Sequence, residues 1–371
     1  MMRWMWHNPS PVTRTRGNRG MGVESLPCLT ADLPGIGGRL KQTPGDFVVR
    51  EIPLYPPSGV GEHLYVRIER EGWTTAALCE ALARLLGIPR SAVGVAGLKD
   101  RHARVTQTFS LHLPRSAADD VIARIEDALP VRVESAAWHT NKLKRGHLLG
   151  NRFQIRVVGT PPEALPRAEA IARRIQTRGL PNYFGSQRFG IRGDNATRGR
   201  EILLEGRRGR RRMRDLLLSA WQSECFNVWL AQRIRRGAFL QMFEGDVAKK
   251  HETGGIFTVT DTAEAQARFL AGEITYTGPL FGYKMRPACG KPGEIETQLL
   301  AEEGITPQML RQARLPGSRR AARLLVADLT LRPIPHGLEF SFTLPKGAYA
   351  TVVLREFMKN ERSERKPDDE D

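Results

Sequence analysis

Alternating apolar and polar positions predict strands near both ends of the chain. An alternation with a period of two residues is typical of a strand with one buried face. The segments that show it are 64–68, 105–113, 131–133, 153–157 and 338–344, and the largely apolar segment 47–52 predicts a further short strand. A turn at 345–347 follows the last of them, and the apolar, β-branched run 349–354 predicts one more strand.

Helical spacing of apolar residues predicts four helices between these strands. They cover 75–86, about 116–129, 161–179 and 215–236. Gly87 ends the first helix, and Ser116 with Asp119 resembles a capping box at the start of the second. The Gly- and Pro-rich section 237–316 mixes short apolar pieces and indicates a small α+β unit.

The length and the mixture of elements indicate an α+β protein with more than one domain. A chain of 371 residues is long enough for two hydrophobic cores. It contains no apolar run of about 18 residues, so we expect no membrane span. Residues 1–30 have the composition of a disordered basic arm, or precede a true start at Met21, and the charged tail 359–371 is expected to be disordered.

A large positive charge indicates a polyanionic partner, with nucleic acid as the first candidate. The chain has 57 Lys and Arg against 40 Asp and Glu, a net charge of +17. Part of the excess forms a cluster of arginines: Arg207, Arg208, Arg210, Arg211, Arg212 and Arg214. Such a cluster either contacts RNA phosphates or forms a solvated face.

Several catalytic classes lack their sequence signatures. The four cysteines are scattered too widely for a zinc site or a disulfide framework, which indicates a reducing cytoplasm. No His-Glu-x-x-His, Walker or Gly-x-Ser-x-Gly motif is present. Metal, nucleoside triphosphate and serine-hydrolase chemistry are therefore poorly supported.

The stretch Gly97 to Ala103 carries the first candidate for chemistry. It presents Asp100 between Lys99 and Arg101, directly before a predicted strand. Neighbouring cations favour the ionised carboxylate, which suits a nucleophile or base. Taken alone, the residue is better explained as an aspartate that hydrogen-bonds its own turn, because such aspartates are common.

Two further stretches combine features of RNA-binding segments. The loop 139–147 contains Lys142, Lys144 and Arg145, which suit a phosphate backbone, although a solvated loop would look the same. Segment 183–189 interleaves aromatic residues with Arg188, either to stack on unpaired bases or to pack tightly at a domain junction.

The order of four motifs resembles the TruD family of tRNA pseudouridine synthases. The motifs are AGLKDRHA at 96–103, KLKRG with GNRF at 142–153, NYFGSQRFG at 182–190 and LPKGAYAT at 344–351. The resemblance covers about residues 33–357. It implies an enzyme that isomerises uridine to pseudouridine in tRNA, at uridine 13 of the D-arm, without a cofactor.

The resemblance also implies a domain arrangement. A catalytic domain with a mixed or antiparallel sheet would comprise residues 31–175 and 327–358, and a smaller α+β domain at 176–326 would be inserted into it. No obligate protein partner is implied, so tRNA is the expected partner of a cytoplasmic monomer.

The matching positions imply roles for individual residues. Asp100 is the catalytic aspartate, acting on a flipped-out nucleotide either at C1′ or by a glycal route. Phe47, Asn151 and Tyr349 would contact the base, although many relatives carry Phe at the Tyr349 position. Four further positions would support this site: Glu51, Lys99, Arg145 and Phe153. The expected contacts to the RNA backbone are Lys142, Lys144, Arg207, Arg208, Arg210, Arg211 and Arg212.

Two other functions remain open from the sequence. A non-catalytic RNA-binding or RNA-folding protein could use the same basic segments. A metal-dependent nuclease using Asp100 and His102 is weakly supported, since no further carboxylate cluster is evident.

Overall fold

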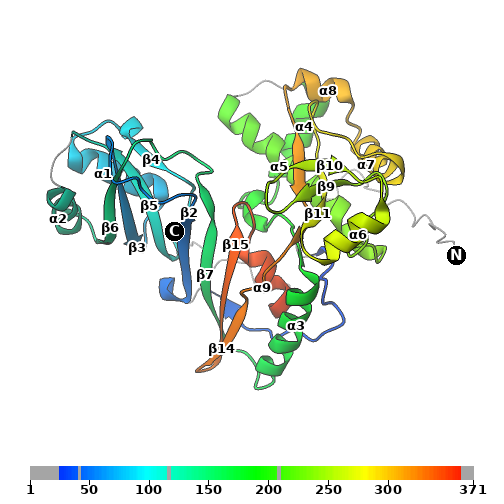
Figure 1. Ribbon diagram of the computed structural model, residues 1–371, viewed down its shortest axis with the longest axis horizontal. Helices are drawn as coiled ribbons and strands as arrows, with labels where there is room; N and C mark the ends of the chain where they lie inside the picture. The colour runs from blue at the N-terminus through cyan, green and yellow to red at the C-terminus, as the bar shows by residue number, and fades with distance from the viewer. Residues whose placement is uncertain (1–24, 41–42, 115–117, 207–209, 361–371) are drawn as a thin grey trace.

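The computed structural model describes residues 25–40, 43–114, 118–206 and 210–360, and is organised around a nine-stranded mixed sheet (Figure 1). Its main order is β14-β15-β7-β2-β5-β3-β6, with β1 paired to β7 and β4 to β5. Only the β2–β5 pair among these is parallel. The strands are β1 Arg39–Leu40, β2 Phe47–Pro53, β3 His63–Arg70, β4 Val93–Val95, β5 Arg104–His112, β6 Val131–His139, β7 Leu148–Val158, β14 Thr330–Ile334 and β15 Gly337–Pro345.

Helices pack near both ends of this sheet. The pair α1 Thr75–Leu86 and α2 Ala118–Ala128 buries its apolar side chains against β3, β5 and β6. Helices α3 Ala164–Arg178 and α9 Ala350–Met358 pack near β14 and β15 (Figure 1). Asp100 lies in the connection between β4 and β5. Strand β4, where this connection starts, contacts α1.

The chain between α3 and β14 forms a second lobe around a four-stranded sheet of order β10-β9-β11-β12. Its strands are β9 Val247–Lys250, β10 Ile256–Thr258, β11 Ile274–Leu280 and β12 Ser318–Ala321. Its helices are α4 Asn195–Glu205, α5 Arg211–Arg235, α6 Thr262–Leu270, α7 Gly290–Glu302 and α8 Pro307–Gln312. The short strands β8 Leu180–Pro181 and β13 Arg323–Leu324 pair where the chain enters and leaves this lobe.

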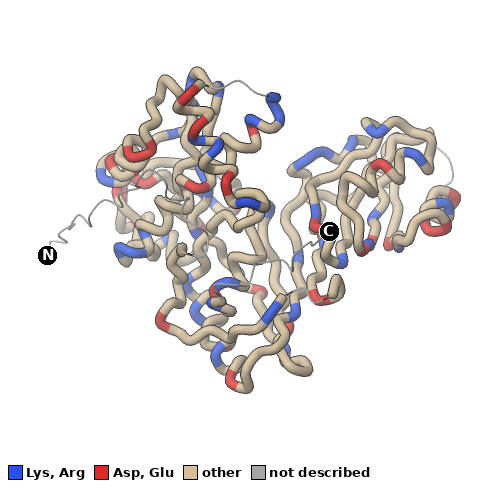
Figure 2. The backbone as a smooth tube through the Cα atoms, turned by 180° about the vertical axis from the view of Figure 1, so that it is seen from behind, with Lys and Arg blue, Asp and Glu red and all other residues tan. Residues whose placement is uncertain are grey.

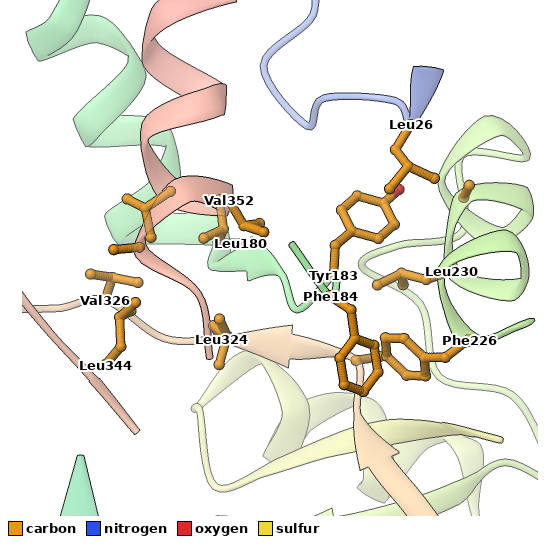
Figure 3. Close-up of a cluster of buried hydrophobic side chains, with 14 of the residues drawn as sticks. Leu26, Leu180, Tyr183, Phe184, Phe226, Leu230, Leu324, Val326, Leu344 and Val352 are labelled. Atoms are coloured by element: carbon orange, nitrogen blue, oxygen red, sulfur yellow. The ribbon is translucent and has the colours of Figure 1, made fainter. Parts of the chain in front are cut away.

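One hydrophobic core continues through both lobes. Leu180 and Leu324 lie near Leu344 and Val352, while Phe184 packs against Phe226 of α5 with ring centroids 5.7 Å apart (Figure 3). All of these side chains are buried. A shared core resists hinge motion, so we expect the two lobes to hold a defined orientation.

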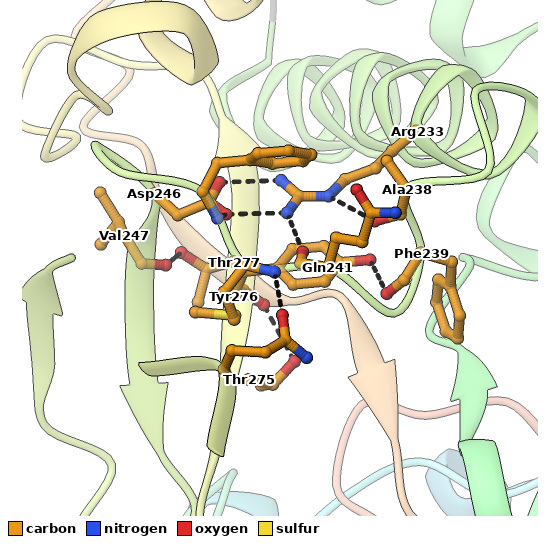
Figure 4. A network of polar contacts seen from close by, with 12 residues as sticks. Arg233, Ala238, Phe239, Gln241, Asp246, Val247, Thr275, Tyr276 and Thr277 are labelled. Carbon is orange, nitrogen blue, oxygen red and sulfur yellow. Dashed lines mark hydrogen bonds and ion pairs between the residues drawn. The ribbon is translucent and has the colours of Figure 1, made fainter. Parts of the chain in front are cut away.

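A buried arginine organises the interior of the second lobe (Figure 4). Arg233 donates two hydrogen bonds to the Asp246 carboxylate, at 2.8 and 2.7 Å, and a third to the Gln241 carbonyl at 2.6 Å. Its guanidinium lies 3.6 Å from the ring centre of Tyr276. Because the carboxylate compensates its charge, the pKa of Arg233 is raised despite the burial.

The main sequence patterns are confirmed. The predicted strands at 47–52, 64–68 and 338–344 are β2, β3 and β15, and the α+β character of 237–316 is present in the second lobe. Helix α1 has its predicted bounds, with Thr74 as N-cap and Gly87 in the left-handed region at φ 66°. The proposed cap Ser116 lies outside the described residues, and α2 is described from Ala118.

The strand predicted at 349–354 is wrong, because this run opens helix α9. Its β-branched residues favour a strand, but Val353 and Phe357 are one helical turn apart and both are buried. Phe357 contacts Phe340 of β15 at 4.8 Å between ring centres. Packing against the sheet therefore outweighs the local propensity.

Strand β5 is buried on both faces, and not on one as the alternation predicted. Its polar side chains Thr106, Thr108 and Ser110 are at most 8% exposed. The Ser110 hydroxyl accepts a hydrogen bond from the Leu143 N–H at 2.9 Å, so the loop after β6 covers this face. Hydrogen bonding lets these polar residues occupy buried positions.

Three predicted boundaries also need correction. Helix α5 begins at Arg211, so Arg211, Arg212 and Arg214 are helical instead of preceding the helix. The expected disordered arm includes residues 25–30, but Thr30 is buried and donates from its N–H to Glu356 at 3.0 Å. In the charged tail, Asn360 donates to the Gly38 carbonyl at 2.8 Å, whereas 361–371 lie outside the described residues.

Candidate functional site

The loop between β4 and β5 presents Asp100 at the protein surface. The Asp100 side chain is exposed, and its Oδ1 accepts a hydrogen bond from the His102 N–H at 3.1 Å. This is the local turn contact that the residue type alone suggested. The neighbouring backbone shows that more than a local turn holds this loop.

Four contacts hold the loop to other elements. The Gly146 N–H donates to the Ala96 carbonyl at 2.8 Å, and the Gln107 amide donates to the Gly97 carbonyl at 2.8 Å. The Lys99 N–H donates to the Thr75 hydroxyl at 2.9 Å, and Arg101 donates from Nε to the Gly72 carbonyl at 3.1 Å. Three of these contacts fix the backbone before Asp100, and the fourth holds the Arg101 side chain after it, which is the kind of preorganisation that catalysis requires.

The side chain of Lys99 points to a buried acid and an amide. Its Nζ lies 3.0 Å from Oε2 of Glu51 and donates to Oδ1 of Asn151 at 2.6 Å. The Lys99 and Glu51 side chains are 6% and 1% exposed. A buried pair of this kind is retained only when each charge compensates the other.

A split in the sheet makes room for this pair. Strand β2 pairs with β5 only as far as Arg50, and continues along β7 beyond that residue. Glu51 stands at the point of divergence, where its Oε1 accepts a hydrogen bond from the Thr108 N–H at 3.3 Å. The glutamate thus replaces a missing partner of β5 while its second oxygen holds Lys99.

Aromatic rings lie on the same strands. Phe47 of β2 and Phe153 of β7 make an edge contact at 6.2 Å between ring centres, and are 6% and 7% exposed. Residues 47, 49 and 51 of β2 share one face by strand alternation, as do 151 and 153 of β7, and the Lys99 contact joins Glu51 with Asn151. The structure therefore brings Phe47, Phe153, Glu51, Asn151 and Lys99 together.

Tyr349 lies where the two lobes meet. It is half-buried and contacts Phe184 at 6.0 Å between ring centres. A Cβ atom on Gly185 would lie 3.0 Å from the Tyr349 ring, so a larger residue at this position would require the ring to shift. Tyr183, Phe184 and Phe189 are buried, which supports packing at the junction for segment 183–189.

A buried polar cluster lies behind the loop and was not predicted from the sequence. Arg70 is 2% exposed and donates to the Thr75 hydroxyl at 3.0 Å and to Gln107 Oε1 at 3.2 Å. Burial lowers the pKa of Arg70 to about 10. Gln107, the one polar residue on the apolar face of β5, was the available signal, because a buried amide needs partners.

The basic segments lie on both lobes. Lys144 and Arg145 are exposed in the loop before β7, whereas Lys142 is half-buried and donates to the Ser91 carbonyl. Arg210, Arg211 and Arg212 are exposed at the start of α5, while Arg207 and Arg208 lie outside the described residues. The start of α5 lies at the edge of its lobe nearest the large sheet (Figures 1 and 2).

The described part of the chain holds neither a metal-binding cluster nor a membrane-spanning helix. Within residues 25–40, 43–114, 118–206 and 210–360, no group of three or more His, Cys, Asp or Glu side chains could hold a metal ion. No helix in those same ranges is long and apolar enough to cross a membrane.

Comparisons with known proteins place this chain in a family. The family model for tRNA pseudouridine synthase D (TruD) matches residues 25–209 and 207–357. A tRNA pseudouridine synthase D from Thermus thermophilus is 45% identical over 339 residues, covering 91% of this chain and 93% of the relative. One from an Anaeromyxobacter species is 45% identical over 348 residues, covering 91% and 97%.

A solved structure agrees with this result at the level of the fold. The crystal structure of a candidate tRNA pseudouridine synthase D from Methanosarcina mazei superposes with a TM-score of 0.73 at 24% identity, covering 91% of this chain and 97% of that one. The fold is that of a pseudouridine synthase with a mixed α+β architecture. The chain belongs to the tRNA pseudouridine synthase D (TruD) family.

Proposed function

We propose that this protein isomerises uridine to pseudouridine in tRNA, at uridine 13 of the D-arm, with Asp100 as the catalytic residue. The observation that carries the proposal is the exposed Asp100 carboxylate on a loop that four contacts hold in place. Family membership supplies the reaction class.

The reaction needs one carboxylate and no redox step. The N1–C1′ bond breaks, the uracil turns over, and C5 bonds to C1′ while the C5 hydrogen leaves as a proton and N1 gains one. The Asp100 carboxylate either attacks C1′ and is later displaced, or removes the C2′ proton to start a glycal route and later returns it. Both routes need an ionised carboxylate that reaches the ribose.

The target base must leave its stack before Asp100 can reach the ribose. Flipping costs stacking energy, which the pocket has to replace. Tyr349 is half-buried and offers part of an aromatic face, while Phe47 and Phe153 provide a nearly closed apolar floor. Asn151 provides an amide for the polar edge of the uracil.

In this proposal the two lobes have different roles, and both contact the RNA. Residues 31–175 and 327–358 form the catalytic domain, and 176–326 form the inserted domain. Lys142, Lys144 and Arg145 from the first, with the arginines at 207–212 from the second, contact the RNA backbone. Support comes from the exposed cations on both lobes and from the position of the α5 start.

Purified protein and unmodified tRNA transcripts test the function. We expect pseudouridine at position 13 of the D-arm, detected by chemical mapping, in reactions without added metal or cofactor. Transcripts in which position 13 is cytidine are the matched control. Pseudouridine at other positions only, or none at all, would contradict the proposal.

A further inference from the structure

The buried contact between Lys99 and Asn151 determines which way the asparagine amide faces. An ammonium group has three donors and no acceptor, so the Asn151 atom 2.6 Å from Lys99 Nζ must be the carbonyl oxygen. The amide nitrogen Nδ2 therefore lies on the opposite branch of the side chain. Among the described residues, none accepts a hydrogen bond from this Nδ2.

Glu51 keeps Lys99 in this position. Its carboxylate lies 3.0 Å from the ammonium, and both side chains are nearly inaccessible to solvent. The same carboxylate accepts from the Thr108 N–H, which ties it to the centre of the sheet. Neither Lys99 nor Glu51 can turn away without leaving a buried charge unpaired.

We propose that Lys99, held by Glu51, fixes the Asn151 amide as a hydrogen-bond donor to O4 of the bound target base, and so selects uracil over cytosine. This inference rests on the proposed function. It makes Lys99 and Glu51 positioning residues, which act through Asn151.

A fixed donor suits both halves of the isomerisation. When the detached uracil turns about the axis through N3 and C6, N1 exchanges with C5 and O2 exchanges with O4. Both oxygens are acceptors, so one amide N–H can hold the base before and after the turn. Cytosine carries an amino group in place of O4, so it would oppose donor to donor as soon as it binds, before any turn.

The test compares two D-arm stem-loop RNAs that differ only in uridine or cytidine at the target position. Wild-type protein should bind the uridine RNA about tenfold or more tightly, because the wrong base leaves buried donors unpaired. In the double variant Glu51→Gln/Lys99→Met, which removes both charges together, the ratio should fall to about twofold or less. Circular dichroism verifies folding.

Two further variants make the result specific. Lys142→Gln removes a cation assigned to the RNA backbone, so both affinities should fall together and the ratio should stay unchanged. Asn151→Asp presents only acceptors beside an intact Lys99, and should shift the preference toward the cytidine RNA even if the double variant does not fold.

Pseudouridine formation on the uridine RNA is measured alongside. Formation by the wild type, together with an unchanged ratio in Asn151→Asp, would overturn this inference and leave the proposed function standing. Absence of the product with wild-type protein would overturn the proposed function itself.

Discussion

The hydroxyl of Thr75 accepts a hydrogen bond from the backbone N–H of Lys99, the residue before Asp100, at 2.9 Å. The same hydroxyl donates to Gln107 at 3.1 Å and accepts from Arg70 at 3.0 Å. One buried side chain at the start of α1 thus links the loop that carries Asp100 to the polar cluster behind it. The position of Asp100 depends on packing in the sheet interior.

Thr75→Val should lower the activity as well as the stability. The variant keeps the side-chain shape but leaves the Lys99 N–H and Arg70 short of an acceptor, at a cost of about 1–3 kcal/mol. Because the loop shifts, we expect kcat to fall at least about tenfold with KM little changed. Steady-state kinetics measure this, and Thr75→Ser, which keeps the hydroxyl, should retain most of the activity. Equal kcat in Val and Ser variants would contradict it.

The arginines at the start of α5 should control the salt dependence of tRNA binding. In Arg210→Gln/Arg211→Gln/Arg212→Gln, the slope of log affinity against log salt should be shallower by about 2, since each lost phosphate contact removes about 0.7–0.9. Arg173→Gln, which removes an exposed arginine of α3, should leave the slope unchanged. Filter binding at several salt concentrations gives the slopes. Identical slopes in the triple variant and the wild type would show that these arginines do not contact RNA phosphates.

The Arg233–Asp246 pair should matter for stability. Asp246→Ala leaves a fully buried guanidinium uncompensated, and should lower the free energy of unfolding by about 3–5 kcal/mol. Glu273→Gln removes one partner of an exposed pair with Arg268 and should cost less than about 1 kcal/mol. Urea denaturation of both variants compares them, and similar losses would argue against the importance of burial.

Glu339 should contribute acid-sensitive stability. Burial alone would raise the pKa of this carboxyl, but hydrogen bonds from Arg332 and Arg156 lower it below its usual 4.5. Its stabilising effect is therefore present above pH 4.5 and is lost as the pH falls through the lower, folded-state pKa. The stability difference between wild type and Glu339→Gln should shrink in that acid range, as thermal melts at about pH 6 and below about pH 4 would show. If the stability difference between wild type and Glu339→Gln instead grew toward low pH, the proposed contribution of Glu339 would be contradicted.

The sequence predicts the positions of helices and strands better than it predicts which residues pack around them. Periodicity was sufficient for α1 and for strands such as β15, because each buries one regular stripe. It failed at 349–354, where the contact between Phe357 and Phe340 decides in favour of a helix. It also failed for β5, since no local pattern reveals that a loop about 30 residues further on covers Ser110.

At the candidate site, too, the sequence points to individual residues, whereas their contacts depend on the fold. Resemblance to the family identified Asp100, Phe47, Asn151 and Tyr349, but the role of Lys99 depends on geometry. Sequence adjacency suggested that Lys99 serves Asp100, whereas its ammonium reaches Glu51 and Asn151 from strands that lie about 50 residues away in either direction. Such a contact requires the sheet register, which a single sequence does not reveal.

Asp100→Asn tests the central claim most directly. The substitution removes the carboxylate but keeps the turn contact to His102, so tRNA binding should stay within about twofold of wild type. Release of tritium from tRNA labelled at uracil C5 should fall by about a thousandfold or more. Release at the wild-type rate by a folded Asp100→Asn protein would show that Asp100 is not the catalytic residue.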